Sequence, residues 1–308
     1  MKHINNISLS LICLFLCLSL CACQSEEDEA INVITENEGE GSCEIVSSSS
    51  YEYDFTSESV EDIVTTVILT YTDDTSQVSY FYEWTGDHDV ILFNENSEVL
   101  AASTYKVPLN MLYYDMIDNG ELSDTSLLYY SSESYSAYDY ISSNYSIGSS
   151  IELSTLQYSS IVYSDNTASL ILLNNYGVLE AYDEMYQKYA QMSFDDDFYY
   201  NNKTTALAGY YIIQYLYENE NDYTQLLENM KIATEGEFLQ ATTDDYEIAH
   251  KYGDYGGYTH DYGIVYTDEP YLVGIYTNQV ANSSELISEI NSVFLNYTLW
   301  KQENSSCS

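Results

Sequence analysis

The spacing of apolar residues changes several times along the chain, and each change predicts an element. Apolar positions at helical spacing follow Ser59, which is placed to cap a first helix. Residues 78–84 and 90–93 are rich in β-branched and aromatic residues and flank Thr-Gly-Asp, which predicts a hairpin. Helical spacing returns over 103–118, where the following Asn-Gly is a stop signal. The first part of the folded chain is therefore predicted to run helix, hairpin, helix.

The rest of the pattern predicts loops, short helices and a return to strands. Residues 124–150 are rich in Tyr and Ser and predict loops. Short helices are expected at 151–162, at 167–175 with a stop at Gly177, and at 204–217. Two strands, 262–267 and 271–277, then flank a turn, and a closing helix starts at Asn282 with Glu285 three residues on. Strands at both chain ends with helices between them predict an α+β domain whose first and last elements share one sheet.

The N-terminal segment has the pattern of an export signal. Almost every residue from Ile7 to Ala22 is apolar, Ser or Cys, the run is short for a membrane span, and a polar stretch begins after Cys23. The run resembles the lipobox of bacterial lipoproteins, which implies that Cys23 is lipidated. The alternative is an ordinary signal with an incidental cysteine. We expect residues 1–22 to be a signal peptide, 23–56 an acidic disordered tether, 57–302 the folded domain and 303–308 a tail.

Charge and cysteine content narrow the partners and the compartment. The chain has 50 acidic and 7 basic residues, a formal net charge of −43, and no arginine. Repulsion excludes nucleic acid as a partner, and we expect a monomer anchored to a membrane by its lipid. Apart from the signal and its anchor, only Cys43 and Cys307 remain, and an oxidising compartment favours one disulfide between them. Two free thiols in the chain's flanks are the alternative. The 36 tyrosines are interpreted as core bulk rather than as platforms for sugars.

Three short motifs carry the candidate chemistry. They are Ser-Thr-Tyr-Lys at 103–106, Ser-Asp-Asn at 164–166 and Lys-Tyr-Gly at 251–253. Three residues along a helix make nearly one turn, so the Lys106 amine is predicted to lie on the same face as the Ser103 hydroxyl. An alcohol needs such a base to become a nucleophile. A serine at the start of a helix also meets unpaired backbone N–H groups, which can form half of an oxyanion hole.

One residue conflicts with a regular helix at this point. Pro108 lies inside the predicted helix and cannot donate a hydrogen bond to the carbonyl of Thr104. We therefore expect the first turn after Ser103 to be distorted.

The three motifs resemble the S-x-x-K, S-D-N and K-T-G set of serine β-lactamases and penicillin-binding proteins, with one mismatch in the third. The resemblance covers roughly residues 57–300. It implies an antiparallel sheet built from both chain ends and flanked by helices, with an all-helical subdomain between. It also implies residue roles: Asn166 holds Lys106 and the substrate amide, Ser164 relays a proton to the leaving group, Lys251 stabilises charge, and the N–H of Asp254 completes the oxyanion hole.

The chain departs from the family where the substrate is expected to bind. Tyr252 stands where the family has Ser or Thr, Gly253 follows it as in the family, and Asp254 adds a negative charge beside the presumed oxyanion hole. No arginine exists to pair with a substrate carboxylate. The E-x-x-L-N loop of class A β-lactamases has no match, and the acidic residues of that segment are interpreted as a solvated face. These are Glu180, Glu184 and Asp195–Asp197.

The sequence therefore predicts a serine hydrolase of β-lactamase type outside the cell, acting on an amide or ester of a small molecule or cell-wall peptide. The alternative is a catalytically silent envelope lipoprotein that retains the cleft for binding. No cofactor is expected, and His88, His250 and His260 lack the spacing of metal ligands. In proteins of the family that this chain resembles, the first and last helices pack together. This packing would bring the flanks that carry Cys43 and Cys307 close to each other.

Overall fold

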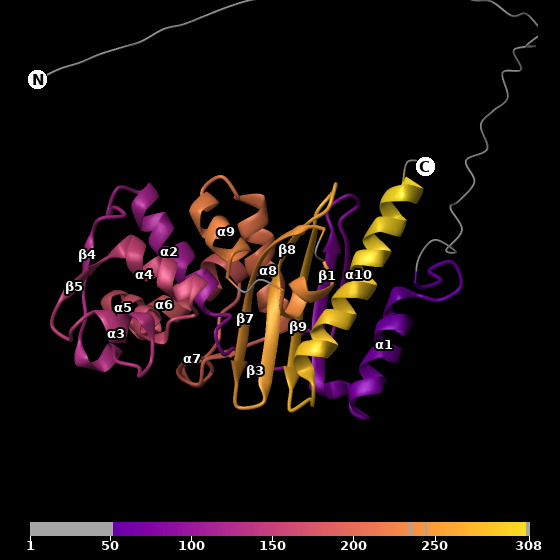
Figure 1. The fold of residues 1–308 in the computed structure, drawn as a ribbon, viewed down its shortest axis with the longest axis horizontal. Helices are drawn as coiled ribbons and strands as arrows, with labels where there is room; N and C mark the ends of the chain where they lie inside the picture. Colours follow the sequence, from indigo (N-terminus) through magenta and orange to yellow (C-terminus); the bar gives the residue numbers. More distant parts are fainter. Residues whose placement is uncertain (1–51, 234–235, 244, 306–308) are drawn as a thin grey trace, which may run out of the picture. The chain divides into compact units, whose positions relative to one another are not determined.

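A five-stranded antiparallel sheet forms the centre of the computed structural model, which describes residues 52–305 apart from 234, 235 and 244 (Figure 1). The predictions for Cys23, Cys43 and Cys307 lie outside these residues. The strand order is β2-β1-β9-β8-β7. The strands are β1 (Val78–Trp84), β2 (Asp89–Phe93), β7 (Glu247–Tyr255), β8 (Tyr258–Tyr266) and β9 (Tyr271–Asn278). Because β1 pairs with β9, the predicted sharing of one sheet by both chain ends is confirmed.

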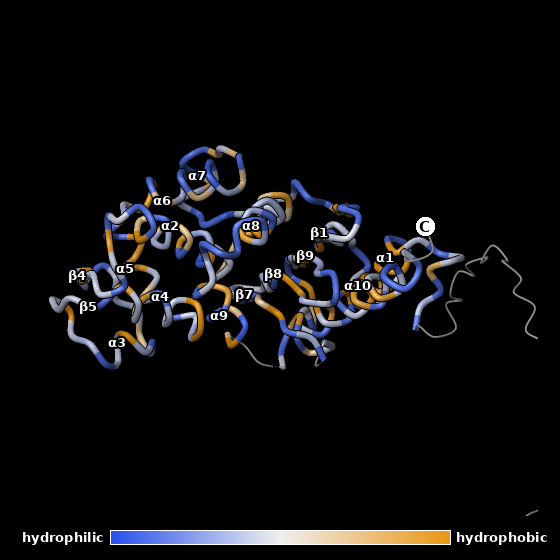
Figure 2. Tube along the Cα trace, turned by 90° about the horizontal axis from the view of Figure 1, so that it is seen from above, coloured by the Kyte–Doolittle hydropathy of each residue, from blue (hydrophilic) through white to orange (hydrophobic). Residues whose placement is uncertain are grey.

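Helices cover both faces of the sheet, as the alternation along β1 requires. Tyr80 and Tyr82 belong to the buried cluster beneath α1 (Val60–Tyr71) and α10 (Ser283–Ser305), whereas Phe81 belongs to the cluster on the α8 side (Figure 2). Successive side chains of a strand point to opposite faces, so all seven residues of β1 are buried. The packed chain reaches back to Phe55, within the range assigned to the tether, where its ring contacts those of Tyr297 and Trp300.

The second part of the domain is mainly helical and lies between β3 and β7 in the sequence (Figure 1). Its helices are α2 (Lys106–Asp118), α3 (Tyr140–Asn144), α4 (Leu153–Val162), α5 (Asn166–Tyr176), α6 (Val178–Met185), α7 (Asp196–Tyr200), α8 (Ala206–Glu218) and α9 (Thr224–Lys231). A π-helical turn at Tyr186–Ala190 follows α6, and 3-10 turns lie at Thr75–Gln77, Ser132–Ser134 and Phe238–Thr242, the last labelled η5 here. Two short strands, β3 (Val99–Leu100) and β6 (Lys203–Thr204), pair with each other.

The segment predicted as loops is more ordered than expected. The strands β4 (Leu127–Tyr129) and β5 (Ser150–Glu152) form a small antiparallel sheet, and α3 lies between them in the sequence. Leu128, Ile141 and Ile151 are buried and fix this segment to the helical core. Such isolated apolar residues among Tyr and Ser have no clear period, which is why the pattern predicted loops. The helix expected from residue 151 begins at Leu153, because the two residues before it pair with β4.

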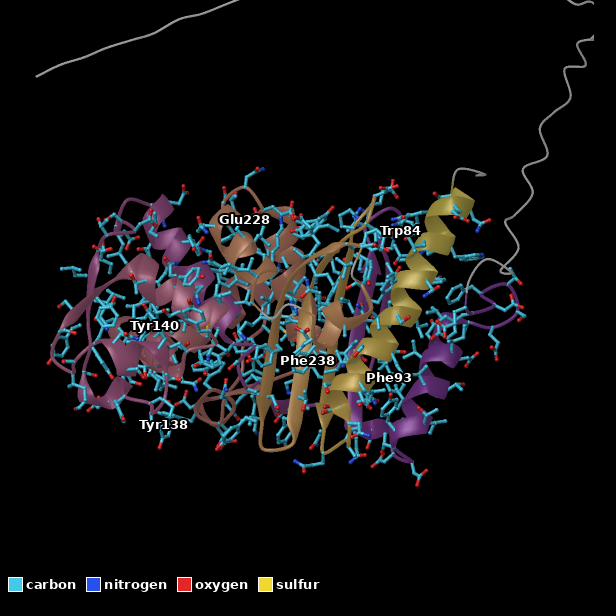
Figure 3. All side chains as sticks on the ribbon, in the orientation of Figure 1. Trp84, Phe93, Tyr138, Tyr140, Glu228 and Phe238 are labelled. Carbon is cyan, nitrogen blue, oxygen red and sulfur yellow. The ribbon has the colours of Figure 1, made fainter. Side chains whose placement is uncertain are left out.

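Tyrosine supplies much of the core, which agrees with the interpretation of the tyrosines as core bulk. Nine tyrosines are among the largest fully buried side chains: Tyr80, Tyr82, Tyr113, Tyr130, Tyr189, Tyr223, Tyr262, Tyr271 and Tyr276. Several of their hydroxyls have internal partners, as buried phenols generally do. The Tyr113 hydroxyl donates to the carbonyl of Leu172 at 2.7 Å and that of Tyr271 to Asn291 at 2.8 Å. In Figure 3 the helical part also carries Tyr138 and Tyr140, and Tyr138 is fully exposed.

Within the described residues, no helix is both long enough and apolar enough to cross a bilayer.

The closing helix α10 begins where the sequence predicted. The carbonyl of Asn282 accepts the first hydrogen bond of α10 from Leu286, although Asn282 has a φ of +53°. Asparagine tolerates this left-handed backbone better than most residues do.

A buried histidine joins the sheet to the strand that precedes Ser103. His260 on β8 donates from Nε2 to the carbonyl of Leu100 at 2.7 Å, and its Nδ1 accepts from the backbone of Thr277 at 3.1 Å. Because Nδ1 accepts a hydrogen bond, the proton of the neutral ring lies on Nε2, from which it is donated to Leu100. Burial lowers the pKa of His260 to about 4, while the bond to Leu100 opposes that shift. The neutral His260 side chain thus holds the end of β3 against the sheet.

We expect this burial to make stability depend on pH. Between pH 6.5 and 4 the unfolded chain takes up a proton on His260 and the folded chain does not. The contribution of His260 is therefore complete above pH 6.5 and declines as the pH falls toward 4, by up to about 3 kcal/mol. Urea unfolding at pH 7.5 and 4.5 should show a larger loss for the wild type than for His260→Gln, in which the amide can donate and accept but does not titrate. Equal losses in the two proteins would contradict this assignment.

Candidate active site

Ser103 lies in the turn between β3 and α2. The turn is tighter than an α-helix: the N–H of Lys106 donates to the carbonyl of Ser103 at 3.2 Å, and that of Val107 to Thr104 at 3.3 Å. Regular helix begins only at Lys106, so the helix predicted from residue 103 starts three residues late. Residues three apart in such a turn lie on the same side of the chain, but the hydrogen bonds of Lys106 Nζ in the described residues go to Ser164 and Asn166 and not to Ser103.

Pro108 produces the distortion expected of the first turn. Because Pro108 has no N–H, the carbonyl of Thr104 lacks the usual helical donor four residues on. The buried hydroxyl of Tyr262, on β8, donates to this carbonyl at 2.8 Å. The proline therefore frees an acceptor through which the sheet holds the turn that carries Ser103.

Lys106 is buried and held by the second motif. Its Nζ donates to the backbone carbonyl of Ser164 at 2.6 Å and to Oδ1 of Asn166 at 2.8 Å, and it lies 3.4 Å from Oγ of Ser164. Burial lowers the pKa of Lys106 to about 7, although the carboxylates of Asp139 and Asp165 act in the opposite direction. Loss of solvation disfavours the ammonium form, so a large share of this amine is neutral at pH 7 and able to accept a proton.

The Ser-Asp-Asn motif forms a sharp turn into α5. Ser164 has a φ of +51°, and the next residue, Asp165, caps the helix by accepting from the N–H of Ala168 at 2.7 Å. The second oxygen of the Asp165 carboxylate accepts from the N–H of Ile141 at 2.7 Å, which ties the turn to α3. Asn166, the first residue of α5, thereby faces Lys106. Asp165 positions the two residues that were predicted to act.

Lys251 is enclosed within the domain. It lies on β7 with no exposed surface, and its Nζ donates to the backbone carbonyl of Tyr252 at 2.9 Å. The same atom is 4.0 Å from the centre of the Tyr252 ring, a cation–π distance. Burial, and next the charge of Lys106, lower the pKa of Lys251 well below its usual range. The Tyr252 ring stacks on Phe238 at 5.0 Å, and burial raises the pKa of the phenol, which the nearby Ser164 hydroxyl opposes.

Gly253 allows β7 to approach the serine turn closely. A Cβ at this position would lie 2.7 Å from the backbone nitrogen of Ser103 and 3.0 Å from the carbonyl oxygen of Ala101. Both atoms belong to the backbone and cannot move aside, so any side chain here would push β7 away from Ser103. The resemblance implies that the N–H groups of Ser103 and Asp254 bind an oxyanion, and Gly253 keeps the strand that carries Asp254 close to Ser103.

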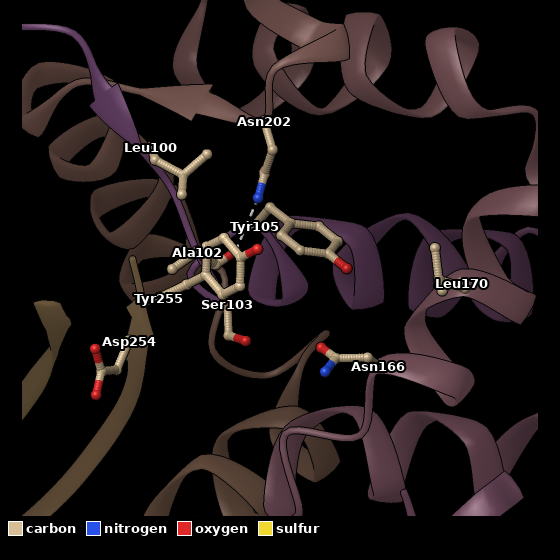
Figure 4. Close-up of a pocket in the computed structure, with 9 residues that line it drawn as sticks. All are labelled: Leu100, Ala102, Ser103, Tyr105, Asn166, Leu170, Asn202, Asp254 and Tyr255. Atoms are coloured by element: carbon tan, nitrogen blue, oxygen red, sulfur yellow. Dashed lines mark hydrogen bonds between the residues drawn. The ribbon is translucent and has the colours of Figure 1, made fainter. Parts of the chain in front are cut away.

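A cleft of about 560 Å³ opens beside Ser103. Figure 4 shows the Ser103 hydroxyl and the Asn166 side chain facing the same space, with Asp254 on the neighbouring strand β7 and its carboxylate turned away from them. Sequence reasoning missed several lining residues, which are Leu100, Ala102, Tyr105, Leu170, Asn202 and Tyr255. Asn202 accepts from the Tyr182 hydroxyl at 2.9 Å and donates to the carbonyl of Ala102 at 3.0 Å. Its φ of +47° is one that asparagine tolerates, but no motif marks the position.

The structure places the other candidate groups outside the cleft. Asp195 caps α7 by accepting from the N–H of Phe198, Asp197 lies 3.4 Å from Lys203, and Glu184 accepts from the Tyr176 hydroxyl. Among the described residues that line the cleft, Asp254 is the sole carboxylate. No group of three or more potential metal ligands occurs in the described part of the chain, and His88 and His250 each contact one carboxylate.

The fold and this cleft are those of a serine hydrolase of β-lactamase type. The family model described as the β-lactamase enzyme family matches residues 59–298, and the chain belongs to that family. A search of curated protein sequences gives no match. Solved structures share the fold at low sequence identity, so they support the architecture alone.

Three of these structures illustrate the likeness. PBP-A has a TM-score of 0.68 and 17% identity over 78% of this chain and 96% of its own. A β-lactamase from Chitinophaga pinensis has a TM-score of 0.66 and 19% identity over 78% and 99%. An ancestral class A β-lactamase has a TM-score of 0.66 and 16% identity over 77% and 99%. The likeness confirms the predicted β-lactamase/transpeptidase-like fold.

We expect acylation of Ser103 by a fluorophosphonate to become faster as the pH rises through about 7, because neutral Lys106 accepts the serine proton. Lys106→Ala should slow labelling by about a hundredfold or more at every pH. Lys231→Ala is the matched control, since it removes one lysine from the surface of α9. Intact-protein mass spectrometry over pH 5.5 to 9 measures these rates. Rapid labelling of Lys106→Ala would show that another group takes the proton.

Proposed function

We propose that this protein is a membrane-anchored serine hydrolase of the cell envelope that forms an acyl-enzyme on Ser103 with an amide or ester substrate. The observation that carries the chemistry is the buried Lys106 amine, which is held by Ser164 and Asn166 and has a pKa lowered to about 7. A base with a pKa near the ambient pH is effective in general base catalysis. The candidate substrates are a β-lactam and a cell-wall peptide.

The reaction follows from the placement of these groups. The Ser103 hydroxyl gives its proton to Lys106 as its oxygen attacks the substrate carbonyl, and the oxyanion is bound by the N–H groups of Ser103 and Asp254. Ser164, whose oxygen lies 3.4 Å from Lys106 Nζ, passes the proton to the leaving group as the carbonyl–leaving group bond breaks. The acyl group then remains on Ser103 as an ester.

Hydrolysis of that ester requires a base that activates water. Among the described lining residues only Asp254 has a carboxylate. Asp254 follows the glycine that packs on Ser103, and it does not lie in the segment before β6, where a match to the E-x-x-L-N loop of class A β-lactamases would be expected. We therefore infer that deacylation is slow and that the acyl-enzyme accumulates. A point mutant of PBP-A, with 17% identity and a TM-score of 0.67, forms an acyl-enzyme complex with penicillin G, which gives the fold a precedent for this species.

The catalytically silent binding protein remains the second candidate because of one specific feature. In the described part of the chain the Ser103 hydroxyl has no hydrogen-bond partner, and the hydrogen bonds of Lys106 Nζ go to Ser164 and Asn166. In a free enzyme such a bond is often long and shortens only when substrate binds. Labelling of Ser103 separates the two candidates.

We expect a fluorophosphonate to add one adduct to the purified domain, on the peptide that contains Ser103. Penicillin G should either give a stable adduct on the same peptide, which supports slow deacylation, or none, which assigns the cleft to another acyl donor. Ser103→Ala should abolish both adducts, and Ser164→Ala should slow their formation because the proton relay is lost. Peptide mapping by mass spectrometry reads out each result. Absence of any fluorophosphonate adduct on the wild type would favour the binding protein.

Anchoring rests on the sequence around Cys23, and we propose lipid attachment at that residue after removal of residues 1–22. In a bacterial host the wild type should partition into the detergent phase of Triton X-114 and take up labelled palmitate. Cys23→Ser should lose both properties, whereas Cys43→Ser should keep them because Cys43 lies beyond the expected cleavage point. Detergent partitioning of Cys23→Ser equal to that of the wild type would exclude a lipid on this cysteine.

A further inference from the structure

The buried Lys251 cannot present its charge to a substrate anion. Its amine is fully buried, donates to the carbonyl of Tyr252 and lies 4.0 Å from the centre of the Tyr252 ring. A carboxylate would have to displace this ring to reach the amine. The ring is also held from outside, because Phe238 stacks on it with an angle of 14° between the two planes.

A buried polar pair fixes the segment that carries Phe238, which Figure 3 shows in front of the strands. The N–H of Leu239 donates to the Asp261 carboxylate at 3.2 Å, and the same oxygen lies 2.7 Å from Nδ1 of His250. Both side chains of this pair are completely buried. The 3-10 turn η5 is thereby tied to β7 and β8, so Tyr252 stands in a fixed position over Lys251.

The charged residue at the edge of the cleft is negative. Asp254 is exposed and lines the same space as Ser103. Its carboxylate has one side-chain contact in the described residues, a hydrogen bond of 3.4 Å from Thr259. The described lysines outside the cleft pair with other carboxylates, which leaves Asp254 without a cation: Lys188 with Asp115, Lys203 with Glu98 and Asp197, Lys231 with Glu228 and Glu247, and Lys301 with Asp87 and Asp89.

We propose that the cleft selects an acyl donor that has a protonated amine near the reacting carbonyl, and that Asp254 binds this amine. The proposal rests on the serine hydrolase function and specifies the substrate of the same site. Asp254 follows Gly253, which packs on the nitrogen of Ser103, so a negative charge stands one residue from the backbone contact at the serine and disfavours an oxyanion there. A cation supplied by the substrate offsets that repulsion, and a carboxylate in its place increases it.

Three fluorophosphonates with the same chain, ending in an aminomethyl, a hydroxymethyl or a carboxylate group, test the proposal. We expect second-order labelling rates of Ser103 to fall in that order, by about tenfold per step at low salt, as expected for charges several ångströms apart near a protein surface. The net charge of −43 favours cations at any surface site, so the wild-type order alone does not identify Asp254. The variants make that distinction.

Asp254→Asn should remove most of the advantage of the amine probe over the hydroxymethyl probe. Asp268→Asn is the matched control, since it changes the net charge equally but lies in the turn at the opposite end of β8, and it should keep the wild-type ratio. An advantage that is unchanged in Asp254→Asn, or absent from the wild type, would overturn the proposal. Failure of all three probes to label Ser103 would instead refute the serine hydrolase function.

The shielding of Lys251 has its own test. Tyr252→Thr removes the ring from the amine, so the carboxylate probe should gain about tenfold relative to the hydroxymethyl probe. Tyr252→Phe retains the ring and should keep the wild-type ratio. A carboxylate probe that gains nothing in Tyr252→Thr would show that the ring is not what prevents Lys251 from binding anions. Circular dichroism of each variant checks that the fold is retained.

Discussion

The close contact between β7 and the turn that carries Ser103 determines the geometry of the whole site. Gly253 and His260 are paired residues on β7 and β8, and both support this turn. The glycine leaves room for the backbone of Ser103, and the histidine donates to the carbonyl of Leu100 just before it. The turn connects the sheet to the helical part, so this contact fixes the position of α2 and, with it, of Lys106. A longer side chain at Gly253 would separate the two N–H groups that an oxyanion needs.

Burial of both cleft lysines is the second constraint, and it separates their roles. Lys106 is surrounded by acceptors from the Ser164–Asn166 turn, with Asp139 and Asp165 near enough to oppose the effect of burial on its pKa. Lys251 has one backbone acceptor and the face of a ring, and the charge of Lys106 acts against its protonation. Two ammonium groups so close in a low-dielectric cleft repel each other. The amine nearer the serine can therefore act as a base, while the other is a poor site for an anion.

Local sequence signals predicted those parts of the fold and site that depend on short-range geometry. The spacing of Ser103 and Lys106 and the distortion at Pro108 each follow from bonds between residues three or four apart. The pairing of the chain ends was predicted from the order of the strands, and the family motifs supplied the helical subdomain. Element boundaries were less accurate, as at Leu153, because two preceding residues join a strand whose partner lies far away in the sequence.

The features that sequence reasoning missed depend on contacts between distant segments. Asn202 reaches the cleft because it bonds to Tyr182 and Ala102, and neither contact leaves a local pattern. Tyr252 could be recognised as a departure from the family, but its effect depends on Phe238, which lies in another element. In a Ser or Thr at this position the hydroxyl would be the group that meets a substrate; in Tyr252 the ring is what covers Lys251. The same substitution thus replaces a short hydroxyl by a bulkier phenol and shields the nearest amine, while Asp254 supplies a charge of the opposite sign. These changes act in one direction, and together they convert a cleft suited to anions into one suited to cations without altering Ser103, Lys106, Ser164 or Asn166.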